Sequence, residues 1–186
     1  MKRLFDVIIA IFLLILLLIP MIVVSILIKL TSRGPVLYWS ERVGRNNANF
    51  RMPKFRSMRI DTPPVATHLL DEPDKYITTV GRFIRKTSLD ELPQILSVLK
   101  GDMSFVGPRP ALFNQDDLVT LRTSKGIHAL IPGITGWAQI NGRDELPIPI
   151  KVDYDLYYLQ HQSFMFDLKI LVMTLSNVII GKGVTH

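Results

Sequence analysis

The residues best suited to chemistry are two adjacent acids, Asp90 and Glu91, in the stretch TSLDELPQ, where a helix is expected to begin. Ser88 and Glu91 match the S-x-x-E capping box, in which each side chain bonds the other residue's backbone N–H. With Asp90 as the cap instead, Pro93 falls at the third helical position, where its missing N–H costs no helix bond. The positive end of a helix also favours a phosphate ligand. This stretch therefore fits helix capping and chemistry on a phosphate alike.

Arginines flank this acid pair in the sequence. Arg85 lies in the preceding short helix, Arg109 in the turn sequence GPRP, and Arg143 in NGRDE. Rigid turns hold the last two, and a fixed guanidinium fork suits phosphate oxygens. Arg82 fits a solvated surface position equally well. Near such cations Asp90 is expected to stay ionised, ready to attack phosphorus. It would also suit Mg²⁺, which takes one or two carboxylates together with the phosphates of a substrate such as a diphosphate.

Composition narrows the classes of function. The chain has 186 residues, enough for one domain with a core, and no cysteine, which excludes a disulfide scaffold and a thiolate zinc site. The four histidines lie far apart and predict no metal cluster, and the P-loop and other common nucleotide and hydrolase motifs are absent. The net charge is +6, and residues 33–60 hold seven bases against Glu41 alone. Anionic headgroups or a phosphorylated substrate suit this patch, and nucleic acid is not an expected partner.

The uncharged run from Val7 to Ile28 predicts a membrane helix. It would reach ~33 Å, enough for a hydrocarbon layer of ~30 Å. It is too long for a cleavable signal and has no A-x-A site after it. Pro20 interrupts the run, so the helix either spans with a kink or breaks there and leaves by the same face as a re-entrant hairpin. We expect a membrane segment over residues 1–32 and a catalytic domain over 33–186, forming one functional unit.

The rest of the chain predicts a mixed α+β fold that is mostly helical. β-like runs around the turn-rich GRNNA predict a β-hairpin, and apolar residues between Leu89 and Leu99 predict a helix that ends at Gly101. The last helix is strongly apolar but too short to span, so it belongs either to the core or to the membrane interface. The expected elements are the hairpin over 36–58, a loop over 61–74, and helices over 78–85, 153–161 and 164–180.

Several of these motifs together resemble a known family. The proline-containing membrane segment, KFRSM, RKTSLDELPQILSVLKGDMSFVGPRP, PGITGWAQINGR and SFMFDLKI are similar to those of the small monotopic phosphoglycosyl transferases, in the bacterial sugar transferase superfamily. The resemblance covers almost the whole chain and is most specific from Ser88 to Pro110. It implies transfer of a phospho-sugar from a UDP-sugar to polyprenol phosphate (undecaprenyl phosphate), with release of UMP. It also implies Mg²⁺ as cofactor and a place on the cytoplasmic face of the bacterial inner membrane, where surface glycan assembly begins.

The resemblance assigns roles to particular residues. Asp90 would be the nucleophile that forms a covalent phospho-sugar intermediate and a ligand of the metal, and Glu91 would support the metal or handle a proton. Pro20 would mark a re-entrant helix, although Ile19 stands where many members have serine, and larger members add several membrane spans and an extra domain before this unit. The predicted substrate-binding residues are Lys54, Arg56, Arg85, Arg109 and Arg143.

Two other functions fit the residues. A membrane-anchored binding protein would use the basic face for anionic lipids or a partner. A hydrolase would split UDP-sugars or lipid diphosphates with water as the acceptor. The stretch DELPIPIKVDYD after Arg143 is where sugar specificity is expected, and the apolar C-terminal helix leaves a homodimer open.

Overall fold

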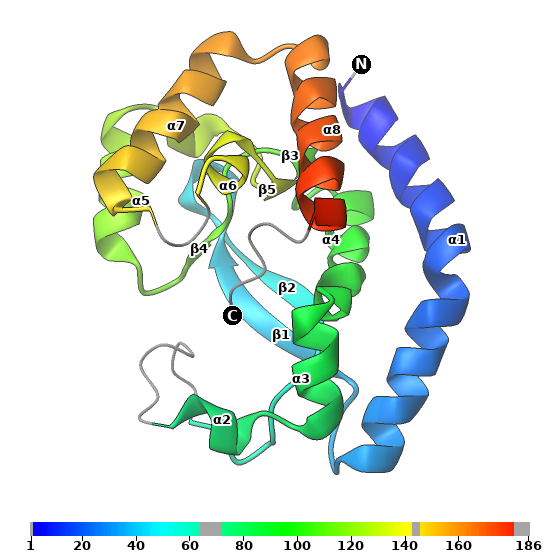
Figure 1. Ribbon diagram of the computed structural model, residues 1–186. Coiled ribbons are helices and arrows are strands. Elements are labelled where there is room, and N and C mark those ends of the chain that lie inside the picture. The colour runs from blue at the N-terminus through cyan, green and yellow to red at the C-terminus, as the bar shows by residue number, and fades with distance from the viewer. Residues whose placement is uncertain (1, 64–71, 143–145, 181–186) are drawn as a thin grey trace.

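The computed structural model describes residues 2–63, 72–142 and 146–180. It confirms a mixed α+β fold in which helices predominate. A long helix, α1, forms one edge of the molecule, and a β-hairpin crosses its middle (Figure 1). Helices α5, α7 and α8 gather at one end, and α2 lies at the other (Figure 1).

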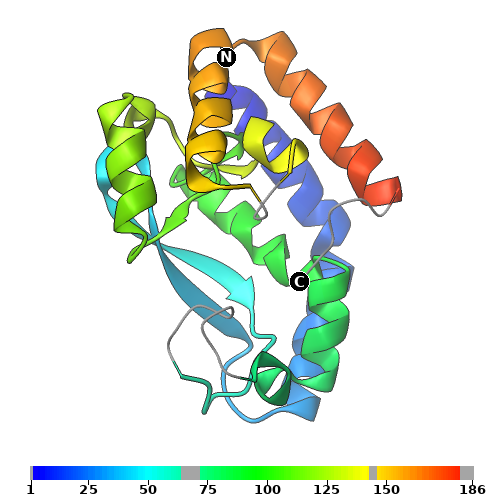
Figure 2. The same ribbon diagram turned by 60° about the vertical axis from the view of Figure 1, so that its left-hand side comes forward.

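Helix α1 (Lys2–Thr31) packs against the rest of the chain along one side. Its buried residues, Asp6, Ala10, Val24 and Ile28, are spaced by about whole helical turns and so share one face. Figures 1 and 2 show α3 and α4 lying alongside this helix. The chain thus places a helix of about 45 Å flat against the domain.

Helix α1 is continuous through Pro20, and Figure 1 shows it changing direction between its two halves. A proline inside a helix removes one hydrogen bond and bends the axis. Both halves pack on the same domain, which holds the helix together across the missing bond, and Figure 1 shows α1 bowed, with its two halves running in different directions. Re-entry into one face of a membrane stays a prediction.

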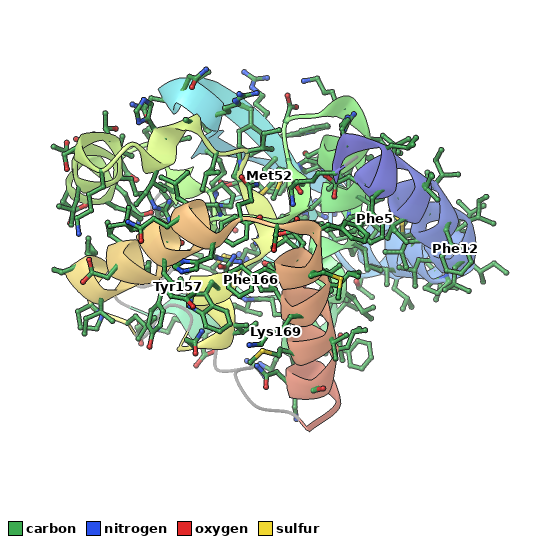
Figure 3. The ribbon with its side chains drawn as sticks, turned by 90° about the horizontal axis from the view of Figure 1, so that it is seen from above. Phe5, Phe12, Met52, Tyr157, Phe166 and Lys169 are labelled. Carbon is green, nitrogen blue, oxygen red and sulfur yellow. The ribbon has the colours of Figure 1, made fainter. Side chains whose placement is uncertain are left out.

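The outer side of α1 is apolar and exposed. The helix is long and apolar enough to cross a membrane, yet only 11% of its most apolar window is buried. A core helix of similar composition would be mostly buried. The exposed apolar side chains of α1 are therefore better explained by an apolar environment outside the protein than by a protein interior. Phe12 points away from the molecule, whereas Phe5 points toward α8 and packs edge-on against Phe164 (Figure 3).

The predicted hairpin is confirmed. Strands β1 (Leu37–Val43) and β2 (Asn49–Phe55) pair antiparallel. The residues Asn46 and Asn47 in the turn η1 (Arg45–Asn47) both have positive φ, which asparagine tolerates. A short strand, β4 (Ala111–Leu112), adds to the other edge of β1.

After the hairpin and the short helix α2, the segments α3, η3 and α4 follow one another, and the acid pair lies in the middle one. The predicted helix over 78–85 is confirmed as α3, and Thr78 caps it by accepting from the N–H of Gly81 at 2.8 Å. The acids lie in a 3₁₀ helix, η3, and the chain then continues as α4, which ends at Gly101 as predicted. These segments and the short helix before them are α2 (Pro73–Tyr76), α3 (Thr79–Lys86), η3 (Leu89–Gln94) and α4 (Ile95–Lys100).

The glycine- and proline-rich stretches form short strands and turns between helices. Strands β3 and β5 pair in parallel, and GPRP leads from β3 across to β4 in the other sheet. The remaining elements are β3 (Ser104–Val106), α5 (Asp116–Ser124), η4 (Ile127–Ala129), β5 (Gly133–Thr135), α6 (Trp137–Ile140), α7 (Ile148–His161) and α8 (Phe164–Ile180).

Helix α8 is not a fully buried core helix. Asp167 and Ile170 face inward, but Met165, Val172 and Leu175 are largely exposed. Its inner side joins an aromatic cluster in which Phe166 packs near Tyr157 and Lys169 lies over the ring of Trp137. Figure 3 shows Tyr157, Phe166 and Lys169 on this inner side.

A buried polar cluster fastens the start of α1 to the domain. Lys2 Nζ lies 2.6 Å from Asp167 Oδ2, and the Tyr158 hydroxyl donates to Asp167 Oδ1 at 2.7 Å. Asp6 Oδ1 accepts from the backbone N–H of Phe105 in β3 at 3.2 Å. Since buried polar groups are stable only when bonded, these contacts fix α1 in register with β3, α7 and α8.

Candidate active site

The acid pair lies in the first turn of η3, directly after a sharp turn at Ser88 that separates η3 from α3. Ser88 has φ 55°, an uncommon left-handed conformation for a residue other than glycine, and its N–H bonds to the carbonyl of Arg85. Its side chain makes no capping bond, so the predicted capping box does not form. Asp90 is not the cap either, because η3 begins at Leu89. The strained turn points to function rather than capping at this position.

Asp90 is a buried carboxylate with an unmet oxygen. The residue is 8% exposed, and its Oδ1 has no hydrogen-bond partner among the described residues. Burial raises the pKa of Asp90 to about 6; Lys54 and Arg85 oppose the rise, and Glu91 adds to it. The expectation from sequence counted the cations and missed the larger effect of burial. At neutral pH the group is still mostly ionised, and it is poorly solvated.

Glu91 is held by two cations from distant parts of the chain. Its Oε1 accepts from Lys54 Nζ at 2.8 Å and lies 3.4 Å from Arg109 Nη2. Lys54 comes from β2 and Arg109 from the GPRP turn. The structure therefore brings four predicted site residues together around the start of η3: Asp90, Glu91, Lys54 and Arg109.

Arg85 belongs to the same site. It lies at the end of α3, and its charge is close enough to lower the pKa of Asp90. Helix α3 is pressed onto the chain after β2 at Gly81, where any added Cβ would overlap the carbonyl of Ser57. This close approach sets the distance between the arginine and the acid pair. Arg82, on the same helix, is exposed, as its surface interpretation predicts.

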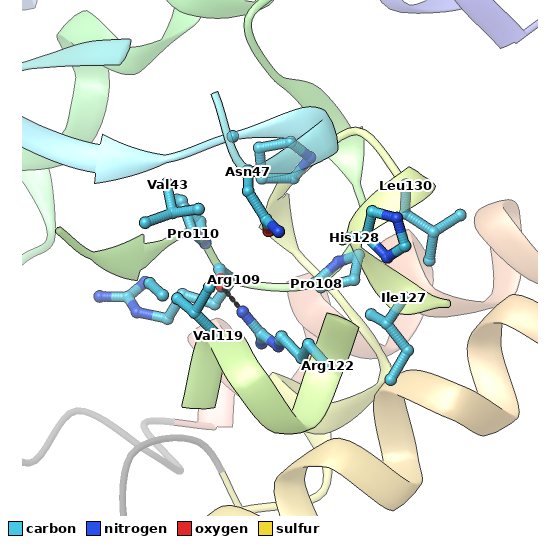
Figure 4. A pocket seen from close by; sticks show the side chains of 13 residues that line it. Val43, Asn47, Pro108, Arg109, Pro110, Val119, Arg122, Ile127, His128 and Leu130 are labelled. Atoms are coloured by element: carbon cyan, nitrogen blue, oxygen red, sulfur yellow. Dashed lines mark hydrogen bonds between the residues drawn. The ribbon is translucent and has the colours of Figure 1, made fainter. Parts of the chain in front are cut away.

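The GPRP turn is built so that Arg109 has a fixed position. The N–H of Gly107 donates to Thr135 O, and the N–H of Gly133 donates to Pro108 O, both at 2.9 Å. An added Cβ at Gly133 would overlap the backbone of Gly107, so β3 and β5 can approach this closely only with glycine. From the other side, Arg122 Nη1 donates to the carbonyl of Arg109 at 2.8 Å (Figure 4).

A narrow cavity beside Arg109 does not serve as the substrate pocket. It is lined by residues from β1, α5 and η4, with Val43, Val119 and His128 among them (Figure 4). Its volume is about 30 Å³, close to the share of one water molecule. A nucleotide is too large for this cavity and would have to bind outside it.

One predicted substrate-binding residue, Arg56, lies apart from this cluster. Arg56 is buried, and its guanidinium donates to Ser32 at 2.7 Å and to the carbonyl of Arg33, just after α1. These contacts favour a structural role of Arg56 at the end of α1, and its role in substrate binding stays a prediction. Arg143 lies outside the described residues.

The acid pair suits Mg²⁺ only together with a substrate. Among the described residues there is no group of three or more acidic, histidine or cysteine side chains around one point. Asp90 offers an unmet buried oxygen, and Glu91 offers a second carboxylate beside it. Magnesium commonly takes one or two protein carboxylates and fills its other positions with substrate phosphates and water. The residues present fit that mode of binding.

The sequence interpretation missed two residues that support the site, Arg122 and Asp155. Arg122 Nη2 and Asp155 Oδ2 lie 2.6 Å apart in a pair that is almost completely buried. They belong to α5 and α7 and are 33 positions apart. No local pattern connects them, so only the packing of the two helices could reveal the pair.

The site and its surroundings define a class of protein. A poorly solvated carboxylate beside a second one held by cations is typical of an enzyme site, and the long exposed apolar helix is of the kind that contacts an apolar partner. Residues 1–181 match the bacterial sugar transferase family, and the chain belongs to that family.

Individual relatives are similar over most of this chain. It is 41% identical over 184 residues to the "uncharacterized sugar transferase EpsL" of Bacillus subtilis, covering 99% of this chain and 90% of that protein. It is 38% identical to the UDP-N-acetylgalactosamine-undecaprenyl-phosphate N-acetylgalactosaminephosphotransferase of Aeromonas hydrophila, over 88% of this chain and 40% of the relative. It is 36% identical to the UDP-glucose:undecaprenyl-phosphate glucose-1-phosphate transferase of Escherichia coli, over 98% of this chain and 41% of the relative.

These names are those of sugar-phosphate transferases, which supports an enzyme of that general kind. The chain spans nearly all of one relative but less than half of the two whose names state a full reaction.

Proposed function

We propose that this chain transfers a sugar 1-phosphate from a UDP-sugar to polyprenol phosphate and releases UMP. The observation that carries the proposal is Asp90, a buried carboxylate whose Oδ1 has no hydrogen-bond partner among the described residues and which lies near Glu91, Lys54 and Arg85. A nucleophile that water does not solvate is more reactive, and the cations around it offset the charge of an incoming diphosphate.

The reaction proceeds in two displacements at phosphorus. An oxygen of Asp90 bonds to the phosphorus that carries the sugar, and the bond from that phosphorus to the UMP oxygen breaks. A phosphate oxygen of polyprenol phosphate then attacks the same phosphorus, and the bond to Asp90 breaks. The products are UMP and a polyprenyl diphosphate sugar, and Asp90 returns to its ionised form.

The neighbouring residues bind and orient the substrate. Arg85 and Arg109 face the phosphates, and Lys54 holds Glu91 in place through its 2.8 Å contact. When bound, Mg²⁺ would add positive charge on the diphosphate, with Asp90 and Glu91 as its protein ligands. The strained turn at Ser88 starts η3 and so places Asp90 in its first turn.

The packing of α1 supports an anchor in one face of the cytoplasmic membrane. Its first half packs near Ile95 and Val98 of α4, and its second half near Ile84 of α3 and Phe55 of β2. A helix covered along its whole length by a polar domain cannot cross a bilayer at right angles, because the domain would enter the hydrocarbon. The exposed side of α1 therefore lies in the lipid while the acid pair stays at the cytoplasmic surface.

The proposal is tested by measuring UMP release and by trapping the intermediate. Detergent-purified protein is given a panel of UDP-sugars with and without polyprenol phosphate and Mg²⁺. Without acceptor, intact-protein mass is expected to increase by one phospho-sugar, and peptide mapping is expected to locate it on Asp90. Asp90→Asn is expected to lose both signals, while Asp102→Asn, at the far end of α4, keeps them.

Other outcomes identify the rival functions. UMP release that needs no polyprenol phosphate, with water as the acceptor, would make the chain a hydrolase. Saturable binding to anionic vesicles, unaffected by Asp90→Asn and accompanied by no turnover of any donor, would make it a binding protein.

A further inference from the structure

The buried pair of Arg122 and Asp155 lies behind the GPRP turn and reaches it directly. Arg122 Nε and Nη2 donate to Asp155 Oδ2 at 3.0 and 2.6 Å, and Arg122 Nη1 donates to the backbone carbonyl of Arg109 at 2.8 Å. Figure 4 shows this last bond between the two arginines. One guanidinium therefore joins α5, α7 and the turn that carries a site residue.

We propose that Arg122 and Asp155 are positioning residues that set where the Arg109 side chain lies relative to Glu91 and the substrate phosphates. The carbonyl of Arg109 is fixed on one side by Arg122, and the neighbouring Pro108 carbonyl is fixed on the other by Gly133. With the main chain held from both sides, the Arg109 guanidinium extends from a defined point. Neither Arg122 nor Asp155 touches the substrate.

The chemistry of the pair explains why it is an arginine and a buried aspartate. A guanidinium has five donors in a planar fork, so it can bind a carboxylate and a carbonyl at the same time; a lysine ammonium cannot keep this geometry. Asp155 is 1% exposed, and its charge keeps the arginine oriented away from solvent. The cost of burying both charges is offset only by such complete bonding.

A second ion pair, between Lys125 and Asp153, connects the same part of the fold and serves as a matched control. Lys125, directly after α5, and Asp153 of α7 form this ion pair, Nζ to Oδ1 at 2.6 Å, but the pair is partly exposed and makes no hydrogen bond to the GPRP turn among the described residues. Lys125→Met therefore removes an ion pair between α5 and α7 without removing a hydrogen bond to Arg109. It separates loss of helix contact from loss of positioning.

The test compares the double variant Arg122→Met/Asp155→Leu with Lys125→Met. Removing both buried charges together avoids an unpaired charge in the interior and keeps the fold. In hydrogen exchange, peptides covering residues 104–112 are expected to exchange faster in the double variant than in the wild type. In Lys125→Met their exchange rate is expected to equal that of the wild type. Unchanged exchange of this segment in the folded double variant would overturn the proposal, whether or not a donor sugar has been found.

The kinetic arm rests on the proposed function. In the wild-type background, the double variant is expected to lower kcat/KM by about tenfold to a hundredfold, the effect of a small misplacement near a reacting centre. In an Arg109→Lys background, the same change is expected to add less than about twofold, because the residue being positioned is already altered. Equal losses in both backgrounds would show that the pair does not act through Arg109.

The two arms keep the two proposals apart. If the wild type turns over no UDP-sugar while the exchange result holds, the proposed reaction fails and the positioning role stands. If turnover is found and the exchange of residues 104–112 is unaffected, the positioning role fails and the reaction stands.

Discussion

The raised pKa of Asp90 predicts that Asp90→Asn gains stability relative to the wild type as the pH rises. The carboxyl titrates at 3.8 when exposed and at about 6 in the folded protein. The pKa is higher in the folded protein than in the unfolded chain. The contribution of the protonated carboxyl to the free energy of unfolding is therefore fully present below pH 3.8 and is lost as the pH rises through about 6. The full shift corresponds to roughly 3 kcal/mol. Between pH 4.5 and pH 8 the difference between variant and wild type should grow by roughly 2 kcal/mol.

Thermal unfolding of the detergent-solubilised proteins at these two pH values, without Mg²⁺, measures the change. For a chain of this size, the growth corresponds to roughly 4–8 °C in the difference between the two midpoints. Any fixed cost of burying the asparagine amide is the same at both pH values and cancels. Asp102→Asn reports the effect of losing a carboxylate outside the acid pair. A midpoint difference that stays constant, or that moves against the variant as pH rises, would refute the burial argument.

Four further predictions concern the anchor and the site. The first half-reaction, followed as covalent labelling without acceptor, should lose its rate as pH falls through about 6, because Asp90 must be ionised to attack; a flat profile would contradict this. Lys54→Met removes a charge that lowers the pKa of Asp90, so the same profile should move to higher pH. Mg²⁺ at pH 8 should raise the thermal midpoint of the wild type and leave that of Asp90→Asn unchanged. Ile15→Lys, on the exposed side of α1, should reduce membrane retention at a cost of about 3 kcal/mol without changing the midpoint in detergent; full retention would place this side of α1 outside the lipid.

Local patterns were enough to predict most of the elements. The turn residues of GRNNA and the flanking β-like runs predict the hairpin, and Gly101, with φ 101°, ends α4 as its place in the sequence predicts. The prediction of a capping box was wrong because Ser88, which follows α3, has a left-handed backbone conformation. In this conformation its side chain makes no capping bond to η3. A pattern of residue types does not contain that backbone conformation.

The site was predicted less completely, because its properties depend on packing. Sequence order places arginines near Asp90 and so predicts that this carboxyl ionises easily. In the structure the largest effect on its pKa is burial under neighbouring elements, which raises it. The pair of Arg122 and Asp155 is invisible for a similar reason, since it forms only when α5 and α7 pack together. Lys54, Glu91 and Arg109 were each predicted, but their meeting at one carboxylate oxygen follows from the way β2 and the GPRP turn reach η3.

The helices on either side of the acid pair are also the ones on which α1 packs. Met21, Val24 and Ile28 of α1 lie against the cluster that includes Ile84 of α3, and Ala10 lies in the same cluster as Val98 of α4. The orientation of the acid pair relative to the apolar side of α1 is therefore set by side-chain packing between α1 and these helices. If α1 lies in a membrane as we propose, a substrate that carries its phosphate at the end of a lipid chain would meet Asp90 from a direction that the packing of α1 determines. Such prior alignment lowers the entropy cost of bringing two reactants together at a membrane surface.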